Sequence, residues 1–386
     1  MLINILNVIA WAVLFIAALP IVYTGIITLA AVRRQTPAPN NAKQLKIAII
    51  IPAHNEALLI QDTVKHALAQ SYPTDKYAVF VVADNCDDDT AYLAQASGAQ
   101  VFERHDNPGK GQALEYAFNA LLLDDWEAFL VIDADSTLSH NALLALNNEF
   151  ATGATALQLF DTIKNPTASM RTLAMQMGMS SFNGLRPAGR TALGQSAGLF
   201  GNGFSLLRHT IEQCPYKAHS IVEDLEYHIF LLEHGHKVRL VEYASSAAQM
   251  PVTAKNASSQ RERWELGRIA MIKHYAKPLY KKTLQGHRWA LEALVDIIMP
   301  PASLMMLLTV VAMVLGSQLV KIASLILIAT LVLHYLIASL RFGSLLGFLK
   351  VSIFVPWYII WKTWLVLKSI IRKKKLPWIR TTRHKE

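Results

Sequence analysis

Two aspartates one residue apart, Asp133 and Asp135, directly follow the apolar run of residues 129–132. At the end of a strand, such carboxylates can both be turned toward one hard cation, Mg²⁺ or Mn²⁺, which takes oxygen ligands and often only a few from protein. A cation held there neutralises the charge that develops on a departing diphosphate. An isolated Asp-x-Asp is more often a plain acidic strand end, but the apolar lead-in and a second acidic turn favour a functional site.

The second acidic turn, residues 84–89, carries four aspartates and follows the apolar run 78–82. Asp84 stands directly at the exit of the predicted strand, where it can accept a hydrogen bond from a nucleotide base or ribose. The other three aspartates are typical of a solvated helix N-terminus, which favours acidic side chains. Residues 52–56 follow the first predicted strand, so we expect their polar groups to border the same crevice, although His54 taken alone is more often structural.

Two further groups could contribute a cation and a base. Lys110 lies in the flexible turn 107–111, for which a solvated turn and a contact to phosphate or base are about equally favoured. Glu223 and Asp224 begin a predicted helix between apolar residues. Carboxylates are common there as caps, whereas a partly buried one could abstract the proton of an acceptor hydroxyl. The residues alone leave these two interpretations even.

Two stretches later in the chain could contact substrate. Residues 260–264, Gln-Arg-Glu-Arg-Trp, combine two guanidinium groups, which match phosphate oxygens, with an indole that can wall a sugar ring. The alternative is the flank of an amphipathic helix near a membrane. The glycine-rich stretch 198–204 is either a close approach of the backbone to substrate or a flexible turn and strand, and we favour the former.

The elements that must position these residues alternate between strand and helix. Apolar runs and helical periodicity predict strands at 46–51, 78–82, 100–102 and 128–132, and helices at 58–70, 90–96 and 111–123. This alternation implies an α/β domain with a parallel sheet, after a linker at 36–44. In open sheets of this kind ligands bind beyond the carboxyl ends of the strands, which is where the acidic turns fall.

Apolar residues make up 53% of the 386-residue chain and are clustered, so part of the chain is expected in lipid. Residues 5–31 exceed the roughly 20 residues that a spanning helix needs. Arg33 and Arg34 follow at once, which places that end in the cytoplasm by the positive-inside rule. Two more spanning stretches, 291–315 and 320–340, predict a helical hairpin.

The apolar stretch 343–371 contains lysines and ends in the basic cluster 372–375. A further span would export that cluster, so we predict helices in the cytoplasmic interface, with Trp357, Tyr358, Trp361 and Trp364 at headgroup depth. The formal net charge of +9 lies largely beside these apolar segments. This distribution suits an anionic membrane surface or phosphate-bearing ligands, and not a nucleic acid. Two cysteines are too few for a disulfide framework and fit a reducing compartment.

The motifs taken in order resemble the series of glycosyltransferase family 2 over residues 47–267. They are Pro52-Ala53-His54-Asn55-Glu56, Asp84-Asn85-Cys86, Lys110-Gly111, Asp133-Ala134-Asp135, Glu223-Asp224 and Gln260-x-x-Arg263-Trp264. The chain looks like the membrane-integrated branch with cellulose, hyaluronan and poly-N-acetylglucosamine synthases, to which ceramide glucosyltransferases are related. The resemblance implies a GT-A fold with a mixed, mostly parallel sheet, and an inverting single displacement without a covalent sugar-enzyme intermediate.

The resemblance also implies roles for individual residues. Asp224 would be the general base, and Asp135 would hold Mg²⁺ or Mn²⁺. The donor would be bound by Pro52, His54, Glu56, Asp84, Lys110, Asp133 and Asp135. Glu223, Gln260, Arg263 and Trp264 would serve the acceptor and the diphosphate. Val222 stands where the synthases frequently have Thr or Ser, and pore-forming synthases commonly carry more than three membrane helices, so processivity is left open.

We therefore expect a multi-pass enzyme of the inner membrane with four segments: a spanning helix (1–34), a cytoplasmic GT-A domain (35–285), a spanning hairpin (286–342), and interfacial helices with a basic tail (343–386). It would move a hexose or N-acetylhexosamine, most simply from a UDP donor, to a polysaccharide or lipid-linked acceptor, as in exopolysaccharide biosynthesis. The alternative is a single transfer to a membrane lipid, of the ceramide glucosyltransferase type. The expected partners are the donor, the acceptor and membrane lipids, and the sequence names no protein partner.

Overall fold

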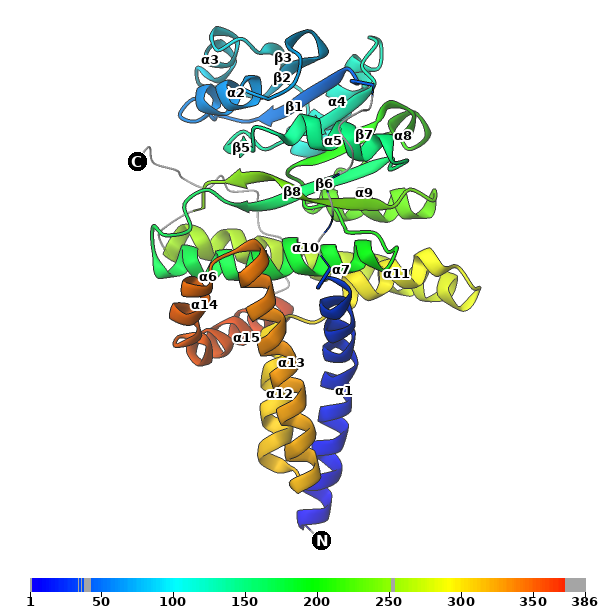
Figure 1. The fold of residues 1–386 in the computed structure, drawn as a ribbon, viewed down its shortest axis with the longest axis vertical. Helices are drawn as coiled ribbons and strands as arrows, with labels where there is room; N and C mark the ends of the chain where they lie inside the picture. Colours follow the sequence, from blue (N-terminus) through cyan, green and yellow to red (C-terminus); the bar gives the residue numbers. More distant parts are fainter. Residues whose placement is uncertain (1, 34, 36, 38–42, 251–253, 372–386) are drawn as a thin grey trace.

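The chain forms a sheet domain, a layer of helices lying across it, and a bundle of three helices leading away from that layer (Figure 1). The structure is a computed structural model and describes residues 2–33, 35, 37, 43–250 and 254–371. The N-terminus lies at the far end of the bundle. The basic cluster 372–375, predicted to lie in the cytoplasm, falls outside the described residues.

One eight-stranded sheet has the strand order β3-β2-β1-β4-β7-β6-β8-β5. The strands are β1 (Ile47–Ala53), β2 (Tyr77–Asp84), β3 (Gln100–Arg104), β4 (Ala128–Val131), β5 (Ser136–Leu138), β6 (Ala156–Ile163), β7 (Phe204–Leu207) and β8 (Val238–Ala248). Neighbours from β3 to β4 run parallel, as do β6 and β8. Strand β7 is antiparallel to β4 and β6, and β5 is antiparallel to β8. The sheet is thus mixed and mostly parallel, as predicted.

Helices cover both faces of this sheet, which explains why β1 is apolar without alternation. Ile47, Ile49 and Ile51 pack in one core with α2 (Ile60–Leu68), α3 (Thr90–Ala96) and α5 (Ala142–Ala151). Ala48 and Ile50 pack in the other core with α4 (Lys110–Leu121), α8 (Arg208–Gln213) and α9 (Glu223–Glu233). Successive side chains of a strand point to opposite faces, so a central strand covered on both sides needs apolar residues at every position.

The predicted elements of the first half of the domain are confirmed, with small changes at their ends. Helix α3 has the predicted bounds, whereas β2 continues through Asp84 and β3 through Arg104. A short 3₁₀ helix (Thr74–Lys76) precedes β2. The strand ends matter for the site: Asp84 is the last residue of β2, and the 133–135 turn begins just beyond the end of β4.

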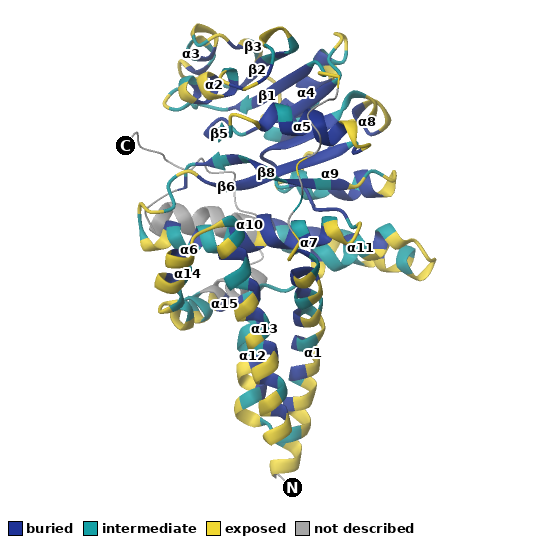
Figure 2. Ribbon diagram, in the orientation of Figure 1, coloured by how far each residue is buried: buried dark blue, intermediate teal, exposed yellow. Residues whose placement is uncertain are grey.

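The helical layer and the bundle are built from the remaining helices. The layer contains α6 (Met170–Met179), a π-helical turn η2 (Ser180–Leu185), α7 (Arg186–Ala192), α10 (Ala254–Leu284) and α11 (Arg288–Ile298). Beside it lie α14 (Leu345–Ser352) and α15 (Val355–Ile371). The bundle contains α1 (Leu2–Ala30), α12 (Ala302–Leu315) and α13 (Gln318–Phe342), which share an apolar core. Its outer surface is largely exposed, and large apolar side chains account for much of it (Figure 2). Residues Ile3–Ala30 and Gln318–Phe342 are long and apolar enough to span a membrane.

The stretch 291–315, predicted as one continuous span, is instead two helices, α11 and α12, bent by 74°. Pro300 and Pro301 lie at the break and explain it. Proline lacks the backbone donor that a continuing helix needs, and its ring clashes with the preceding turn. Helix α11 packs against α9 and α10 through Ala290, Ala293 and Ile297. Of the two helices only α12 lies within the bundle, and the membrane-spanning hairpin stays a prediction.

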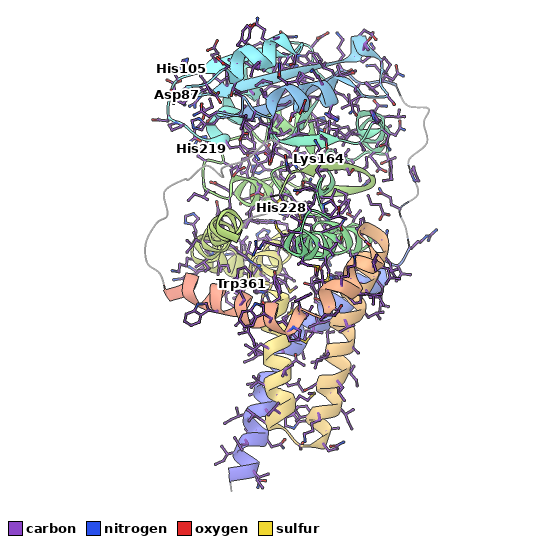
Figure 3. The ribbon with its side chains drawn as sticks, turned by 90° about the vertical axis from the view of Figure 1, so that its left-hand side faces the viewer. Asp87, His105, Lys164, His219, His228 and Trp361 are labelled. Atoms are coloured by element: carbon purple, nitrogen blue, oxygen red, sulfur yellow. The ribbon has the colours of Figure 1, made fainter. Side chains whose placement is uncertain are left out.

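Helices α14 and α15 turn away from the bundle and lie beside the layer (Figure 1). Helix α14 contacts α6 and α13, and α15 contacts α10 and α12. Trp357 and Trp364 are 72% and 67% exposed, and Trp361 lies near the point where the bundle leaves the layer (Figure 3). This arrangement agrees with the prediction that the segment does not continue as another arm of the bundle; its position relative to a membrane remains a prediction.

Candidate active site

Lys110 joins three of the motifs that the sequence singled out. It begins α4, and its ammonium donates to Asp133 Oδ1 at 2.6 Å and to the carbonyl oxygen of Gly201 at 2.7 Å. It also lies 3.6 Å from Glu223 Oε1. Burial alone lowers the pKa of this ammonium, but the surrounding carboxylates outweigh burial and hold the pKa above its ordinary value. Lys110 is therefore a permanent positive charge beside the acidic turn.

Glu223 and Asp224 occupy the first turn of α9, on the other side of Lys110. Asp224 Oδ1 accepts a hydrogen bond from the backbone N–H of Leu225 at 2.8 Å, a local helix-start contact. Burial raises the pKa of Glu223 to about 7, with Lys110 opposing the change and Asp224 adding to it. Burial also raises the pKa of Asp224. Carboxylates perturbed in this way are better proton acceptors near neutral pH than exposed ones.

Gly201 permits this close grouping. Its φ is +73°, in the left-handed region, and a Cβ at this position would lie 3.3 Å from Lys110 Nζ and 3.4 Å from Asp224 Oδ2. A side chain would therefore be strained and would crowd both groups. The stretch 198–204 thus approaches these side chains closely at Gly201, and its approach to substrate stays a prediction.

Asp133 and Asp135 differ in their surroundings. The Asp133 side chain is 37% exposed, whereas Asp135 is buried and lines a cavity of about 330 Å³. Other residues around this cavity include Asp62, Thr137, Lys164 and Gln249. Among the described residues, no three His, Cys, Asp or Glu side chains form a metal-binding group. The two carboxylates nevertheless suit a hard cation that takes its other oxygen ligands from a diphosphate and water.

The strand ends near the predicted nucleotide site are tied to one another. His54 Nδ1 and the carbonyl oxygen of Asp84 are 2.7 Å apart. Asp84 Oδ1 accepts from Arg104 at 2.6 Å, and Oδ2 accepts from the N–H of Gly109 at 2.8 Å. The structure thus brings residues 52–56, Asp84 and the turn before Lys110 together. Both Asp84 oxygens already accept bonds from the chain, and its contact with a base remains a prediction.

The predicted helix-start role in the 84–89 turn is seen at Asp88. Its Oδ1 accepts from the backbone N–H of Thr90 at 3.0 Å, and its Oδ2 accepts from the N–H of Ala57. Glu56 is held nearby, because its N–H donates to the Thr90 hydroxyl at 2.7 Å. Asp87 lies at the end of the sheet domain farthest from the bundle (Figure 3).

The predicted acceptor and diphosphate residues Gln260, Arg263 and Trp264 lie on α10, but their side chains are outside the described part of the structure. The entry to their segment is described. Asn165 exchanges two hydrogen bonds with the backbone of Met250, at 2.9 and 3.0 Å, just beyond β8. These two bonds hold Met250, the last described residue before α10, beside the cavity that Asp135 lines.

Two residues behind the 133–135 turn were not predicted in their roles. The sequence did not single out Asp161, and it identified no partner for Asn202. Asn202 Oδ1 accepts the backbone N–H of Asp133 at 3.1 Å, and its Nδ2 donates to Asp161 Oδ1 at 2.8 Å. Burial, followed by the charge of Asp133, raises the pKa of Asp161 well above its ordinary value. The available signal was one acidic residue inside the apolar strand pattern of β6.

Comparisons with known proteins identify the family and the fold of the chain. Residues 44–267 match the family described as Glycosyltransferase like family 2. YdaM, a probable glycosyltransferase of Bacillus subtilis, is 27% identical over 254 residues, which are 62% of this chain and 60% of that protein. A beta-monoglucosyldiacylglycerol synthase of Nostoc sp. is 26% identical over 234 residues, 57% of this chain and 48% of that protein. The chain thus spans less than two thirds of the length of either relative.

A mannosyltransferase from Pyrobaculum calidifontis, solved in complex with GDP-Man and Mn²⁺, is similar to nearly the whole chain. The likeness covers 93% of this chain and 99% of that one, with a TM-score of 0.56 and 17% sequence identity. It identifies the fold of the sheet domain as GT-A, with the mixed, mostly parallel sheet described above.

Proposed function

The chain belongs to the family described as Glycosyltransferase like family 2, and from this we propose that it moves a hexose or N-acetylhexosamine from a UDP-sugar to a saccharide or lipid-linked acceptor. The observation that carries the proposal is the grouping of Lys110, Asp133, Glu223 and Asp224 around Gly201. This grouping brings one ammonium and three carboxylates into one small region, which supports a donor-side role for Asp133 and a base role for Asp224.

In the proposed reaction the acceptor hydroxyl attacks the anomeric carbon from the face opposite the diphosphate. The new carbon–oxygen bond forms while the bond to the diphosphate oxygen breaks, and the diphosphate leaves with that electron pair. Asp224 takes the proton of the attacking hydroxyl, a role that its raised pKa supports. Because the two groups occupy opposite faces, the anomeric configuration inverts.

The other residues bind and position the donor. Asp84, with His54 behind it, faces the nucleotide, and Pro52 and Glu56 border it. Asp133 contacts the donor, while Asp135 holds Mg²⁺ or Mn²⁺, which when bound neutralises charge on the departing diphosphate. Lys110 keeps Asp133 oriented and adds a fixed positive charge beside the diphosphate. Glu223, Gln260, Arg263 and Trp264 complete the acceptor side.

We place the enzyme in the cell membrane with the GT-A domain in the cytoplasm. Helices α1 and α13 have spanning length and composition, and α12 packs with them in one apolar core. The exposed tryptophans of α15 suit headgroup depth, where their rings are partly apolar and partly polar. The acceptor is then met at the inner face of the membrane.

One observation favours the second candidate, a single transfer to a membrane lipid. The described helices offer two spans, or three if α11 and α12 count together. The Nostoc relative is named for the synthesis of a glycolipid. The length of the product, measured with labelled donor, purified full chain and candidate acceptors, separates single transfer from extension of a polysaccharide. A product that carries one added sugar contradicts extension.

Release of free nucleotide from a panel of UDP- and GDP-sugars tests the proposed activity. We expect turnover with Mn²⁺ or Mg²⁺ by the parent, and strong loss in Asp135→Ala and Asp224→Asn. Asp125→Asn is the matched control, because the Asp125 side chain is 75% exposed and pairs with Lys46 at the surface. Undiminished turnover in both site variants would contradict the proposed roles.

A further inference from the structure

Behind the acidic turn, a chain of buried amide and carboxylate groups leads from the active site to the helical layer. Asn202 is 3% exposed, Asp161 is 6% exposed and Asn183 is 6% exposed. They come from the loop before β7, from β6 and from the π-helical turn η2. The reaction proposed above uses none of them.

The side-chain amide of Asn202 has to be oriented in one way. Its Oδ1 accepts from the backbone N–H of Asp133 at 3.1 Å and from the hydroxyl of Ser246 at 2.9 Å. Turning the amide over would place its NH₂ against the Asp133 N–H, where two donors would face each other. Nothing in Asn202 itself prefers one orientation.

Asp161 enforces the same orientation from the other end of the amide. Its Oδ1 accepts from Asn202 Nδ2 at 2.8 Å, so the NH₂ end of the amide, which can only donate, faces Asp161. Its Oδ2 accepts from Asn183 Nδ2 at 3.0 Å, and the same amide nitrogen lies 3.2 Å from the Asp161 carbonyl oxygen. Two amide donors thus offset the burial of one carboxylate, and the Asn202 oxygen is left facing Asp133.

The π-helical turn that carries Asn183 is held from the bundle side. The Ser181 hydroxyl lies 2.8 Å from His334 Nε2 of α13. At Gly184 a Cβ would lie 2.7 Å from the Phe342 ring, so the turn packs directly on the end of α13. The turn that carries Asn183 is therefore held by its contacts with α13, independently of the bond between Asn183 and Asp161.

We propose that Asp161 is a positioning residue for the metal and donor site: by setting the amide orientation of Asn202 it fixes the backbone N–H of Asp133, and with it the direction of the Asp133 and Asp135 carboxylates. Asp161 does not touch the substrate. The inference rests on the proposed function, because it assigns a supporting role to the same metal and donor site.

The test exchanges the carboxylate and the amide. In Asp161→Asn, one side-chain oxygen must serve both Asn202 and Asn183, so one amide loses its acceptor. Adding Asn183→Asp restores the pairing, since the amide introduced by the first substitution can accept from Asn202 and donate to the carboxylate introduced by the second. Glu149→Gln is the control, because Glu149 is an equally buried carboxylate that bonds Arg239 and Tyr243 away from the site.

Binding of UDP and GDP to the full chain in detergent is measured calorimetrically over a range of Mn²⁺ concentrations, without turnover. We expect Asp161→Asn to raise the Mn²⁺ concentration needed for half-maximal nucleotide binding about 10- to 100-fold, the range for lost supporting contacts at metal sites. The double variant should return to within a few-fold of the parent, and Glu149→Gln should leave the Mn²⁺ dependence unchanged.

Three outcomes are distinguishable. If the parent binds neither nucleotide with Mn²⁺ or Mg²⁺, the proposed function fails. If the parent binds and Asp161→Asn has the same Mn²⁺ dependence, the positioning role is overturned. If Asp161→Asn is impaired and the double variant is equally impaired while folded, as judged by its melting temperature, the role of amide orientation is overturned.

Discussion

Two clusters in this molecule each combine cationic side chains with carboxylates, and they differ in how completely the protein pairs the opposite charges. The active-site cluster is Lys110 with Asp133, Glu223 and Asp224. The anchoring cluster joins α7 to α11 within the helical layer and consists of Arg186 and Arg190 with Glu292 and Asp296. Both contain positive groups and carboxylates, but the first includes a partly exposed carboxylate, Asp133, and a single residue separates it from Asp135, which lines a cavity.

In the anchoring cluster the charges are paired by other elements of the protein. Arg190 is fully buried, donates to the Ser196 carbonyl oxygen at 2.6 Å and lies 3.4 Å from Glu292 and 3.6 Å from Asp296. Asp296 also pairs with Arg186. His228, from α9 (Figure 3), has its Nδ1 3.7 Å from Asp296 Oδ2, and burial lowers its pKa to about 3, so it stays neutral.

In the active-site cluster the described residues set one ammonium against three carboxylates. This imbalance accompanies the raised pKa values of Glu223 and Asp224, where burial is the larger cause. Charge that the protein leaves uncompensated suits a ligand or a proton in transit, whereas compensated charge holds elements together. We therefore expect substitutions in the first cluster to change rate, and those in the second to change stability.

Asp224→Asn should give the largest effect. Without the base, kcat should fall about 10²- to 10⁴-fold, the usual contribution of general-base catalysis. The isosteric amide can still accept from the Leu225 N–H, so the melting temperature and nucleotide binding should stay near those of the parent. A fall in melting temperature that matches the loss of rate would place Asp224 with the anchoring residues instead.

Arg190→Met should show the opposite pattern. Removing one partner of a buried ion network leaves Glu292 and Asp296 less compensated and should cost about 3–5 kcal/mol of unfolding free energy. The rate per folded molecule should change little. Unfolding in denaturant measures this, and Lys282→Met, which breaks a half-exposed pair with Glu233, should cost less than about 1 kcal/mol.

Lys110→Met should lower the rate, as expected for the active-site cluster, but by less than Asp224→Asn. It removes a charge-assisted hydrogen bond to Asp133, worth about 1.5–3 kcal/mol, so kcat/KM should drop roughly 10- to 100-fold. Loss of the ammonium should also move the activity profile to higher pH, because the carboxylates lose their neighbouring positive charge. An unchanged pH profile would argue against direct coupling of Lys110 to the pair.

The smallest expected effect is the change of activity with pH around neutrality. With a pKa of about 7, Glu223 ionises as the pH rises through neutrality, and we expect activity to rise severalfold over the same interval. The stabilising contribution of this raised pKa is fully present below the unfolded value of 4.5 and is lost as the pH rises to about 7. Glu223→Gln should weaken both dependences, in rate and in unfolding free energy measured from about pH 5 to 8.

Much of the fold could be predicted from local patterns. The first strands and helices, and the positions of Asp84 and Asp133 at strand exits, follow from apolar periodicity between neighbouring residues. The spanning character of α1 and α13 follows from composition over one segment. The break before α12 was missed because the apolar content of 291–315 outweighed Pro300 and Pro301, although proline was a readable signal.

The order and character of the motifs are what the sequence by itself determined; the metal role of Asp135 stays a prediction. Only the tertiary structure decided that Lys110 meets Asp133 and Gly201, and that Asp161 supports Asn202. These contacts join residues 23, 91 and 41 positions apart. The physical reason is that strand and helix preferences depend on nearby side chains, whereas such contacts depend on strand order and register, which are settled when distant segments pack together.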